Sequence, residues 1–237
     1  MKKISLLACA FIIPFLIGCT KTEDFGIGTI KIYVARPCDT VRVFNAFLIH
    51  ETFEQLPYTI KERFNNDSMN EIIAIDYLLD LNIGPKGPYR KFDGETLSND
   101  TEITQQMVLY YELKGKKGGS TPEYVEYRVE ELERIIITCN QTLFGLETGS
   151  SLNDKFEIMR DILPFYFTYD KQMIVKDEPW GAIDDYLARR PMAPATLYLR
   201  LTEIPPEAPC EVAFSVEVKV ADKEPFHATA QPITLLR

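Results

Sequence analysis

Hydrophobic residues at every second position are the feature that most narrows the folds open to this 237-residue chain. The clearest run is FSVEVKV at Phe214–Val220, in which Phe and three Val residues alternate with Ser, Glu and Lys. Successive side chains of a β-strand point to opposite faces, so this run predicts a strand with one buried face. Further strands are predicted at residues 29–34, 41–50, 70–79, 107–113, 133–138, 196–204 and 225–236.

Helical spacing is scarcer along the chain. Leu152, Phe156 and Met159 recur at helical spacing, which predicts a short helix over residues 152–161, and a second is predicted over residues 180–189. Clusters of Gly and Pro between the apolar runs predict turns, and the C-terminal part of the chain predicts three antiparallel strands with short links. Many short strands with few helices favour a mainly β protein, an antiparallel β-sandwich with one or two short helices.

The N-terminus has the anatomy of an export signal. Lys2 and Lys3 precede an apolar run over residues 4–17. This run is shorter than the ~20 residues that a helix needs to cross the hydrocarbon core of a membrane. It therefore predicts a cleaved signal peptide in preference to a transmembrane anchor.

The apolar run ends in Leu-Ile-Gly-Cys, which resembles the lipobox of bacterial lipoproteins. In that motif lipid is attached to the cysteine thiol and the chain is cut just before the cysteine. The resemblance implies cleavage between Gly18 and Cys19 and a covalent lipid on Cys19, with no other cofactor; an ordinary secretory signal is the alternative. Thr20 is not the aspartate that resembles an inner-membrane retention mark, which favours the outer membrane, at its periplasmic face or at the cell surface. The expected organisation is a signal peptide at residues 1–18, a lipidated stalk at 19–28 and a single β-sandwich-like domain at 29–237.

Charge limits the classes of partner. The chain has a formal net charge of −9, and residues 1–18 contain only basic charges, so the mature protein would be more acidic still. Nucleic acids and anionic membrane surfaces are bound by basic patches, so neither is an expected partner. Contact with the membrane is expected through the acyl chains on Cys19. Besides Cys19, the mature chain has Cys38, Cys139 and Cys210, which either form one disulfide or stay buried as small hydrophobic residues.

Part of the chain resembles a family of uncharacterised lipoproteins from Gram-negative gut anaerobes. The resemblance lies in ERIIITCNQTLFGLETGSSLNDKF at residues 133–156 and in LYLRLTEIPPE at residues 197–207, followed by an alternating hairpin. Cys139 stands where that family usually carries a small polar residue. The family is a domain of unknown function, so the resemblance implies an envelope location and a fold, and it implies no chemistry.

Catalytic and metal-binding motifs are not found in the sequence. HETFE, which begins at His50, lacks the second histidine of the zinc-protease motif H-E-x-x-H. The run Gly-Ser-Ser-Leu-Asn, which begins at Gly149, lacks the closing glycine of a nucleophile elbow. No catalytic residue and no metal ligand is therefore predicted. A glycosidase needs only two suitably placed carboxylates, and the 35 acidic residues leave that possibility open.

Aromatic residues gather between residues 165 and 180. Phe165, Tyr166, Tyr169 and Trp180 are either ordinary core residues or a loop platform on which a sugar or a peptide stacks, because aromatic rings bury a large area at low entropic cost. A separate run, Asp-Ser-Met around Ser68, resembles the acceptor motif for O-glycans in some Gram-negative envelope proteins. Ser68 is therefore a candidate O-glycan site.

The sequence favours a non-enzymatic outer-membrane lipoprotein that binds another envelope component, either protein or glycan. Two alternatives stay open. One is an envelope glycan hydrolase that uses paired carboxylates. The other is a structural subunit that assembles by β-strand addition at an exposed sheet edge.

Overall fold

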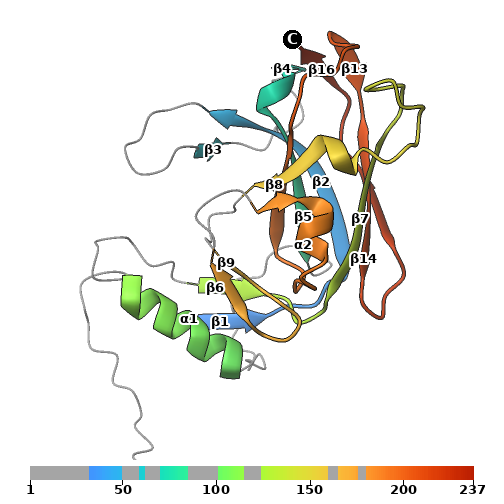
Figure 1. Cartoon of the computed structure of the whole chain (residues 1–237). Coiled ribbons are helices and arrows are strands. Elements are labelled where there is room, and N and C mark those ends of the chain that lie inside the picture. Colours follow the sequence, from blue (N-terminus) through green and yellow to red (C-terminus); the bar gives the residue numbers. More distant parts are fainter. Residues whose placement is uncertain are drawn as a thin grey trace, which may run out of the picture.

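The computed structural model of the chain describes residues 32–49, 59–61, 70–84, 101–114, 124–159, 165–175 and 180–237. These residues form a β-sandwich-like fold with two short α-helices, α1 and α2, which confirms the predicted fold class (Figure 1). Within the described part of the chain, no helix is long and apolar enough to cross a membrane.

The larger layer of the sandwich is a six-stranded sheet in which every neighbouring pair is antiparallel. Its central strand β5 is buried along almost its whole length, because both faces of the sheet are covered. The strands, in spatial order, are β11 (Gly181–Ala182), β8 (Phe156–Met159), β12 (Thr196–Leu201), β5 (Tyr77–Gly84), β2 (Thr40–Ile49) and β3 (Thr59–Lys61).

The opposite layer consists of two three-stranded sheets. One is antiparallel and contains β15 (Phe226–Thr229), β14 (Phe214–Val220) and β7 (Leu132–Cys139); the other contains β13 (Cys210–Val212), β16 (Ile233–Leu236) and β4 (Glu71–Ile73). Alternate residues of β14 face the six-stranded sheet, and Tyr77 of β5 stacks on Phe214 of β14 with 5.2 Å between the ring centroids. The core therefore lies between the layers, where each fully buried apolar side chain contributes about 1.5–3 kcal/mol.

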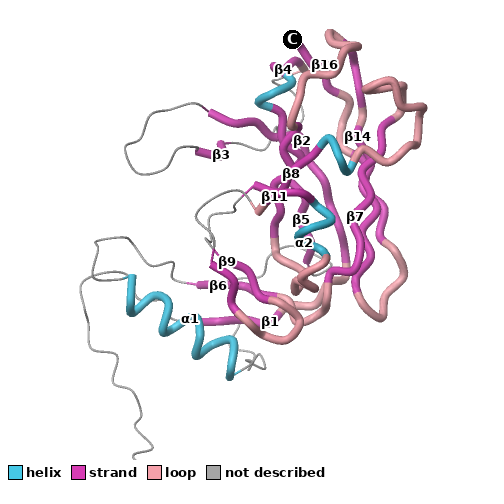
Figure 2. The backbone as a smooth tube through the Cα atoms, in the orientation of Figure 1, coloured by secondary structure: helices cyan, strands magenta, loops and turns pink. Residues whose placement is uncertain are grey.

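A smaller group of elements lies at one end of the sandwich (Figures 1 and 2). It contains α1 (Thr101–Lys114), the parallel pair β1 (Ile32–Ala35) and β6 (Tyr124–Tyr127), and the hairpin of β9 (Phe165–Phe167) and β10 (Met173–Val175). Its own hydrophobic cluster joins α1 to β9 through Ile103, Met107, Phe165, Phe167 and Met192. The hairpin is thus held between this cluster and the main core.

Two of the predicted elements are wrong in type. Residues 107–113 are not a strand, because they lie within α1, where Ile103 and Met107, four residues apart, pack against β9. Residues 152–161 are not an α-helix, because a 3-10 turn at Asn153–Lys155 leads into strand β8. Phe156 and Ile158 of β8 point into the main core at a spacing of two.

Other predictions are confirmed in part. The predicted helix at 180–189 exists as the shorter α2 (Ile183–Leu187), and the strand predicted at 70–79 is divided by a 3-10 turn at Ala74–Asp76. Of the three strands predicted near the C-terminus, only β14 and β15 pair directly. β12 lies in the six-stranded sheet instead, and the chain after β15 continues as β16 in a different sheet.

The outer edge of β7 is covered by the side chain and backbone of the loop that follows it. Asn153 Oδ1 accepts a hydrogen bond from the backbone N–H of Ile137 at 2.9 Å, and Asn153 Nδ2 donates to the carbonyl of Ile135 at 2.7 Å. The backbone N–H of Leu152 donates to the carbonyl of Ile137 at 2.8 Å. Asn153 therefore takes the place of a neighbouring strand at an edge that would otherwise offer unpaired backbone groups.

Candidate functional site

The four residues of the predicted aromatic platform do not share one exposed surface. Phe165, Tyr166 and Trp180 are buried, and only Tyr169 is exposed, with 46% of its surface accessible. The reason is that β9 has hydrophobic clusters on both of its faces, so that adjacent residues of the strand are buried on opposite sides. Phe165, Tyr166 and Trp180 are thus ordinary core residues, and the exposed candidate is reduced to Tyr169.

The buried rings support the region behind Tyr169. Tyr166 packs against Trp180 and Tyr186 with centroid distances of 4.9 Å to each, and Trp180 stacks nearly parallel to Tyr186 at 5.5 Å. The backbone N–H of Trp180 also donates to the carbonyl of Ile158 in β8 at 2.8 Å. This three-ring stack attaches α2 and the β9 hairpin to the end of the sandwich.

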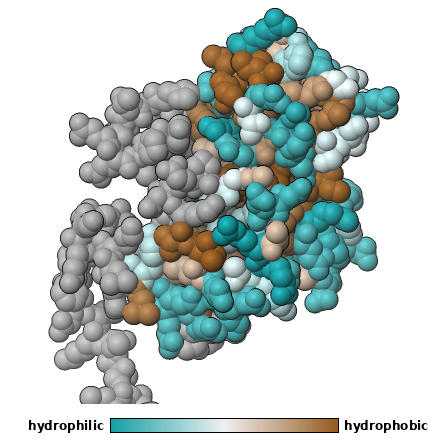
Figure 3. Space-filling model, in the orientation of Figure 1, coloured by the Kyte–Doolittle hydropathy of each residue, from teal (hydrophilic) through white to brown (hydrophobic). Residues whose placement is uncertain are grey.

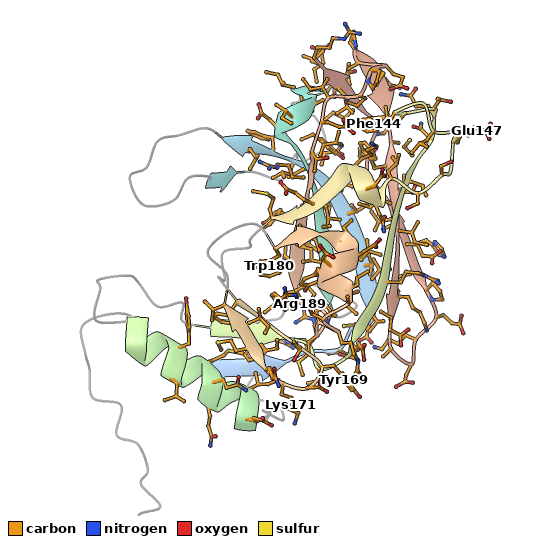
Figure 4. All side chains as sticks on the ribbon, in the orientation of Figure 1. Phe144, Glu147, Tyr169, Lys171, Trp180 and Arg189 are labelled. Atoms are coloured by element: carbon orange, nitrogen blue, oxygen red, sulfur yellow. The ribbon has the colours of Figure 1, made fainter. Side chains whose placement is uncertain are left out.

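Arg189 links the stack to the surface. Burial raises the pKa of the Tyr166 hydroxyl, whereas the charge of the exposed Arg189 and a side-chain hydrogen bond to it lower the pKa in part. Figure 4 shows Arg189 between Trp180 and Tyr169, at the side of the molecule where α2 approaches the hairpin. Tyr166 therefore helps to position the exposed region around Tyr169, although Tyr166 itself is buried.

Tyr169 lies in a tight turn between β9 and β10. The backbone N–H of Thr168 donates to the carbonyl of Gln172 at 2.9 Å, and that of Lys171 donates to the carbonyl of Thr168 at 2.8 Å. The Thr168 hydroxyl accepts a further bond from the N–H of Gln172. Lys171 has a φ of 61°, in the left-handed region that closes such turns. The turn is thus held by its own hydrogen bonds.

Helix α1 fixes this turn from the other side. Gln106 Nε2 donates to the carbonyl of Lys171 at 2.6 Å, and Gln106 Oε1 accepts from the backbone N–H of Met173 at 3.0 Å. One side-chain amide therefore satisfies two backbone groups of the hairpin. The tertiary contact between α1 and β10 restricts the backbone that carries Tyr169.

The segment after α2 brings Tyr169 next to Arg190 and Glu131. The segment Arg190 to Ala193 lies between the end of β9 and the start of β7: the N–H of Tyr169 donates to the carbonyl of Arg190 at 2.6 Å, and the N–H of Leu132 donates to that of Pro191 at 2.9 Å. Arg190 itself has a φ of 52°, which is uncommon for a residue with a long side chain. Such conformations concentrate at functional sites, where the surrounding structure maintains them.

The Arg190 guanidinium covers one face of the Tyr169 ring, 5.0 Å from the centroid. Its Nε and Nη2 donate to the two carboxylate oxygens of Glu131 at 3.0 and 2.8 Å, and Nη1 lies 3.8 Å from Asp170. Glu131 is the main reason that the pKa of Arg190 is raised above its usual value, so Arg190 is a permanent cation. Glu131, Tyr169, Asp170 and Arg190 are called the Tyr169 surface below.

The groups of the Tyr169 surface hold one another in place. A cation–π contact, a bidentate ion pair and a hydrogen-bonded turn together fix one exposed aromatic ring with polar groups beside it. Glu131 has both carboxylate oxygens occupied by Arg190, which leaves it poorly placed to act as a general base. Among the described residues, no group of three or more His, Cys, Asp or Glu residues is suited to a metal ion.

The remaining predicted site residues are not tested by the structure. Gly18, Cys19 and Ser68 lie outside the described residues, so lipidation, signal cleavage and O-glycosylation stay predictions. Cys38, Cys139 and Cys210 are free thiols; Cys38 and Cys139 are buried, as the hydrophobic-residue alternative expects, whereas Cys210 is only half-buried.

Arg190, Asp170 and Glu131 were not anticipated as partners of Tyr169. Glu131 is 59 positions away from Arg190 in sequence, and no periodic pattern connects them. The available signal was the Arg189-Arg190-Pro191 run directly after a predicted helix, since a proline commonly follows a helix end. Comparisons of the chain with protein-family models, with curated proteins and with solved structures find no match.

Proposed function

We propose that this protein is a non-enzymatic binding module of the bacterial envelope, anchored in the outer membrane by lipid on Cys19, and that it binds through the Tyr169 surface. The observation that carries the proposal is the exposed Tyr169 ring, fixed by Arg190 on one face and by the turn beneath it. The lipobox-like run at the N-terminus supports the anchor.

Rigidity is what makes this surface suited to recognition. Binding has an entropic cost when loops and side chains must be ordered, and a ring that is already ordered avoids much of that cost. Tyrosine offers a large apolar face and a polar hydroxyl while losing little rotamer freedom. Gln106, Glu131 and the three-ring stack behind Tyr169 all restrict its position.

The proposed anchor would increase the effective concentration of the domain near envelope partners. When a module and its partner are attached to the same membrane, their binding resembles an intramolecular reaction. Weak contacts through one small surface are then sufficient for stable association. Two or more acyl chains hold a protein stably at a membrane, whereas one chain binds only marginally. A shallow site of this kind is consistent with a tethered protein.

The two alternatives have less support. A hydrolase needs carboxylates with free oxygens, and the carboxylate of Glu131 in the Tyr169 surface is engaged by Arg190. Strand addition needs an open sheet edge, and Asn153 covers the edge of β7. The engaged carboxylate of Glu131 and the covered edge of β7 therefore favour a binding module over a hydrolase and over a subunit that assembles by strand addition.

The test is a binding and cleavage assay with residues 20–237, which lack the lipidated cysteine. The protein is titrated with fractionated capsular polysaccharide, peptidoglycan fragments and envelope proteins, and products are followed by mass spectrometry. The proposal expects binding without product, weakened at least several-fold in Tyr169→Ala. Ile204→Ala is the matched control, because Ile204 has a similar exposed fraction of 42%. Product formation, or equal binding by Tyr169→Ala, contradicts the proposal.

A further inference from the structure

We infer that the ligand of the Tyr169 surface is an uncharged pyranose of a glycan, stacked on the free part of the Tyr169 ring and hydrogen-bonded through its hydroxyl groups to Asp170 and Arg190. This inference rests on the proposed function, because it names the ligand class of the same surface. It is carried by the size of the exposed ring, by the chemistry of the groups next to it and by their charges.

The size of the aromatic surface fits a single sugar ring. Tyr169 is 46% exposed and Arg190 lies over one face of its ring, so the ring offers at most one open face to a ligand. One such face matches the apolar C–H face of a pyranose. A specific protein interface usually buries ~1,200–2,000 Å² around an apolar centre, which one tyrosine does not provide.

The surroundings of the ring are hydrophilic. Figure 3 shows hydrophilic residues over most of the lower part of the visible described surface, together with a hydrophobic patch beside the grey residues. The immediate neighbours of Tyr169 are Asp170, with 69% of its side chain exposed, and Arg190, with 52% exposed. A ring with a polar surround favours a ligand that has both an apolar face and many hydroxyl groups.

Asp170 and Arg190 supply complementary hydrogen-bonding groups. An ionised carboxylate only accepts hydrogen bonds, whereas a guanidinium only donates them. Arg190 Nη1 and Asp170 Oδ1 lie 3.8 Å apart, so the two groups are close enough to contact neighbouring hydroxyls of one ring. Each sugar hydroxyl is both donor and acceptor and satisfies either partner.

Charge disfavours an anionic ligand. A ligand stacked on Tyr169 would meet the exposed carboxylate of Asp170, while the charge of Arg190 is already opposed by Glu131 and Asp170. Arg189 and Lys171 add positive charge nearby, so an anion is disfavoured by the exposed carboxylate of Asp170 beside the ring and not by the summed charge of the neighbouring side chains. The whole chain, at −9, repels polyanions at longer range.

The test uses residues 20–237 and isothermal titration with oligosaccharides of known charge. Neutral gluco-, manno- and galacto-oligosaccharides and chitin oligosaccharides are compared with oligogalacturonates, heparan sulfate fragments and vesicles of anionic phospholipid. We expect binding to at least one neutral series. Tyr169→Ala weakens it about tenfold or more, whereas Tyr169→Phe, which keeps the ring, stays within about threefold. Thermal unfolding of each variant shows that the fold is retained.

The Asp170→Asn variant distinguishes a neutral ligand from an anionic one. The amide keeps an acceptor and loses the negative charge, so neutral-sugar binding changes only a few-fold, whereas binding of an anionic ligand would become stronger. Tyr169-dependent binding confined to anionic glycans, to vesicles or to proteins overturns the ligand class and leaves the proposed binding function standing. If no ligand of any class binds in a Tyr169-dependent way, both the ligand class and the proposed binding function are overturned.

Discussion

Asn153 stabilises the fold through two hydrogen bonds to the backbone of β7. Its amide accepts a hydrogen bond from the N–H of Ile137 and donates one to the carbonyl of Ile135, and the side chains of these two residues are fully buried. Each such bond contributes ~1 kcal/mol, and an unsatisfied buried group costs more. We expect Asn153→Ala to lower the free energy of unfolding by about 2 kcal/mol, measured by urea denaturation.

The control for this prediction is the exposed neighbour Ser151. Ser151→Ala should change the free energy of unfolding by less than ~0.5 kcal/mol, as is usual for surface positions. Asn153→Asp keeps the acceptor for Ile137 and places a second oxygen against the carbonyl of Ile135, so it should be at least as destabilising as Asn153→Ala. Equal stability of Asn153→Ala and Ser151→Ala would show that the loop is not needed at the β7 edge.

Glu130 gives stability a dependence on pH. It accepts the backbone N–H of Cys38 at 3.2 Å and lies 3.3 Å from Lys223. Burial raises the pKa of Glu130, but hydrogen bonds from the N–H groups of Cys38 and of Glu130 itself, together with Lys223, lower it overall below 4.5. Burial and the adjacent Glu130 raise the pKa of the Cys38 thiol to about 12, so the thiol stays protonated.

The sign of the effect follows from the lowered pKa. The contribution of Glu130 is complete above the unfolded-state pKa of 4.5 and is lost as the pH falls through the lower folded-state value. We expect Glu130→Gln to cost about 1–2 kcal/mol at pH 7 and progressively less below pH 4.5. Urea unfolding of both proteins between pH 7 and pH 3 measures the difference. A difference that is constant with pH would contradict this role.

At the scale of elements, α1 determines how firmly the hairpin holds Tyr169. Gln106 bonds to the carbonyl of Lys171 and to the N–H of Met173. We expect Gln106→Ala to increase amide exchange of Met173 about tenfold, because this N–H loses its partner. Gln106→Glu retains the acceptor for Met173 but places an oxygen against the carbonyl of Lys171, so it should preserve only part of the protection. If Met173 exchanges at the same rate in all three proteins, α1 does not hold the hairpin.

Alternation predicted the strands that have one face in the core. β12, β14 and the part of β7 from Ile135 to Cys139 were found in this way, because their buried residues recur every second position. α1 was missed because residues 107–111 are a short apolar and aromatic run, which fits a strand as well as a helix. The helix is favoured because Ile103, Met107 and Tyr110 pack against β9. This is a tertiary contact, which the local sequence does not show.

The candidate site was predictable only in part. The aromatic cluster pointed to Tyr169, but the sequence could not show that β9 is covered on both faces and that Phe165, Tyr166 and Trp180 are buried. Arg190 and Glu131 reach Tyr169 because the segment after α2 pairs with two separate parts of the chain. Such long-range pairing leaves no periodic signal in the sequence.

At the scale of the whole molecule, the proposed anchor makes a prediction independent of the binding site. In cells, the wild-type protein should sediment with membranes and be released by detergent, with a mature N-terminus at Cys19 that carries lipid. Cys19→Ser should remove the lipid and shift the protein to the precursor form or to the soluble fraction, since the thiol is the attachment point. Unchanged membrane association of Cys19→Ser, or a mature N-terminus elsewhere, would remove the lipoprotein proposal.

We propose that the molecule binds its ligand through the end that carries the hairpin of β9 and β10. Hydrogen–deuterium exchange of residues 20–237, with and without a bound envelope ligand, tests it directly. We expect slower exchange in the turn at 168–172 and in the segment at 189–191, and no change at the far end around β4, β13 and β16. Protection confined to that far end, with the hairpin unaffected, would show that binding occurs elsewhere.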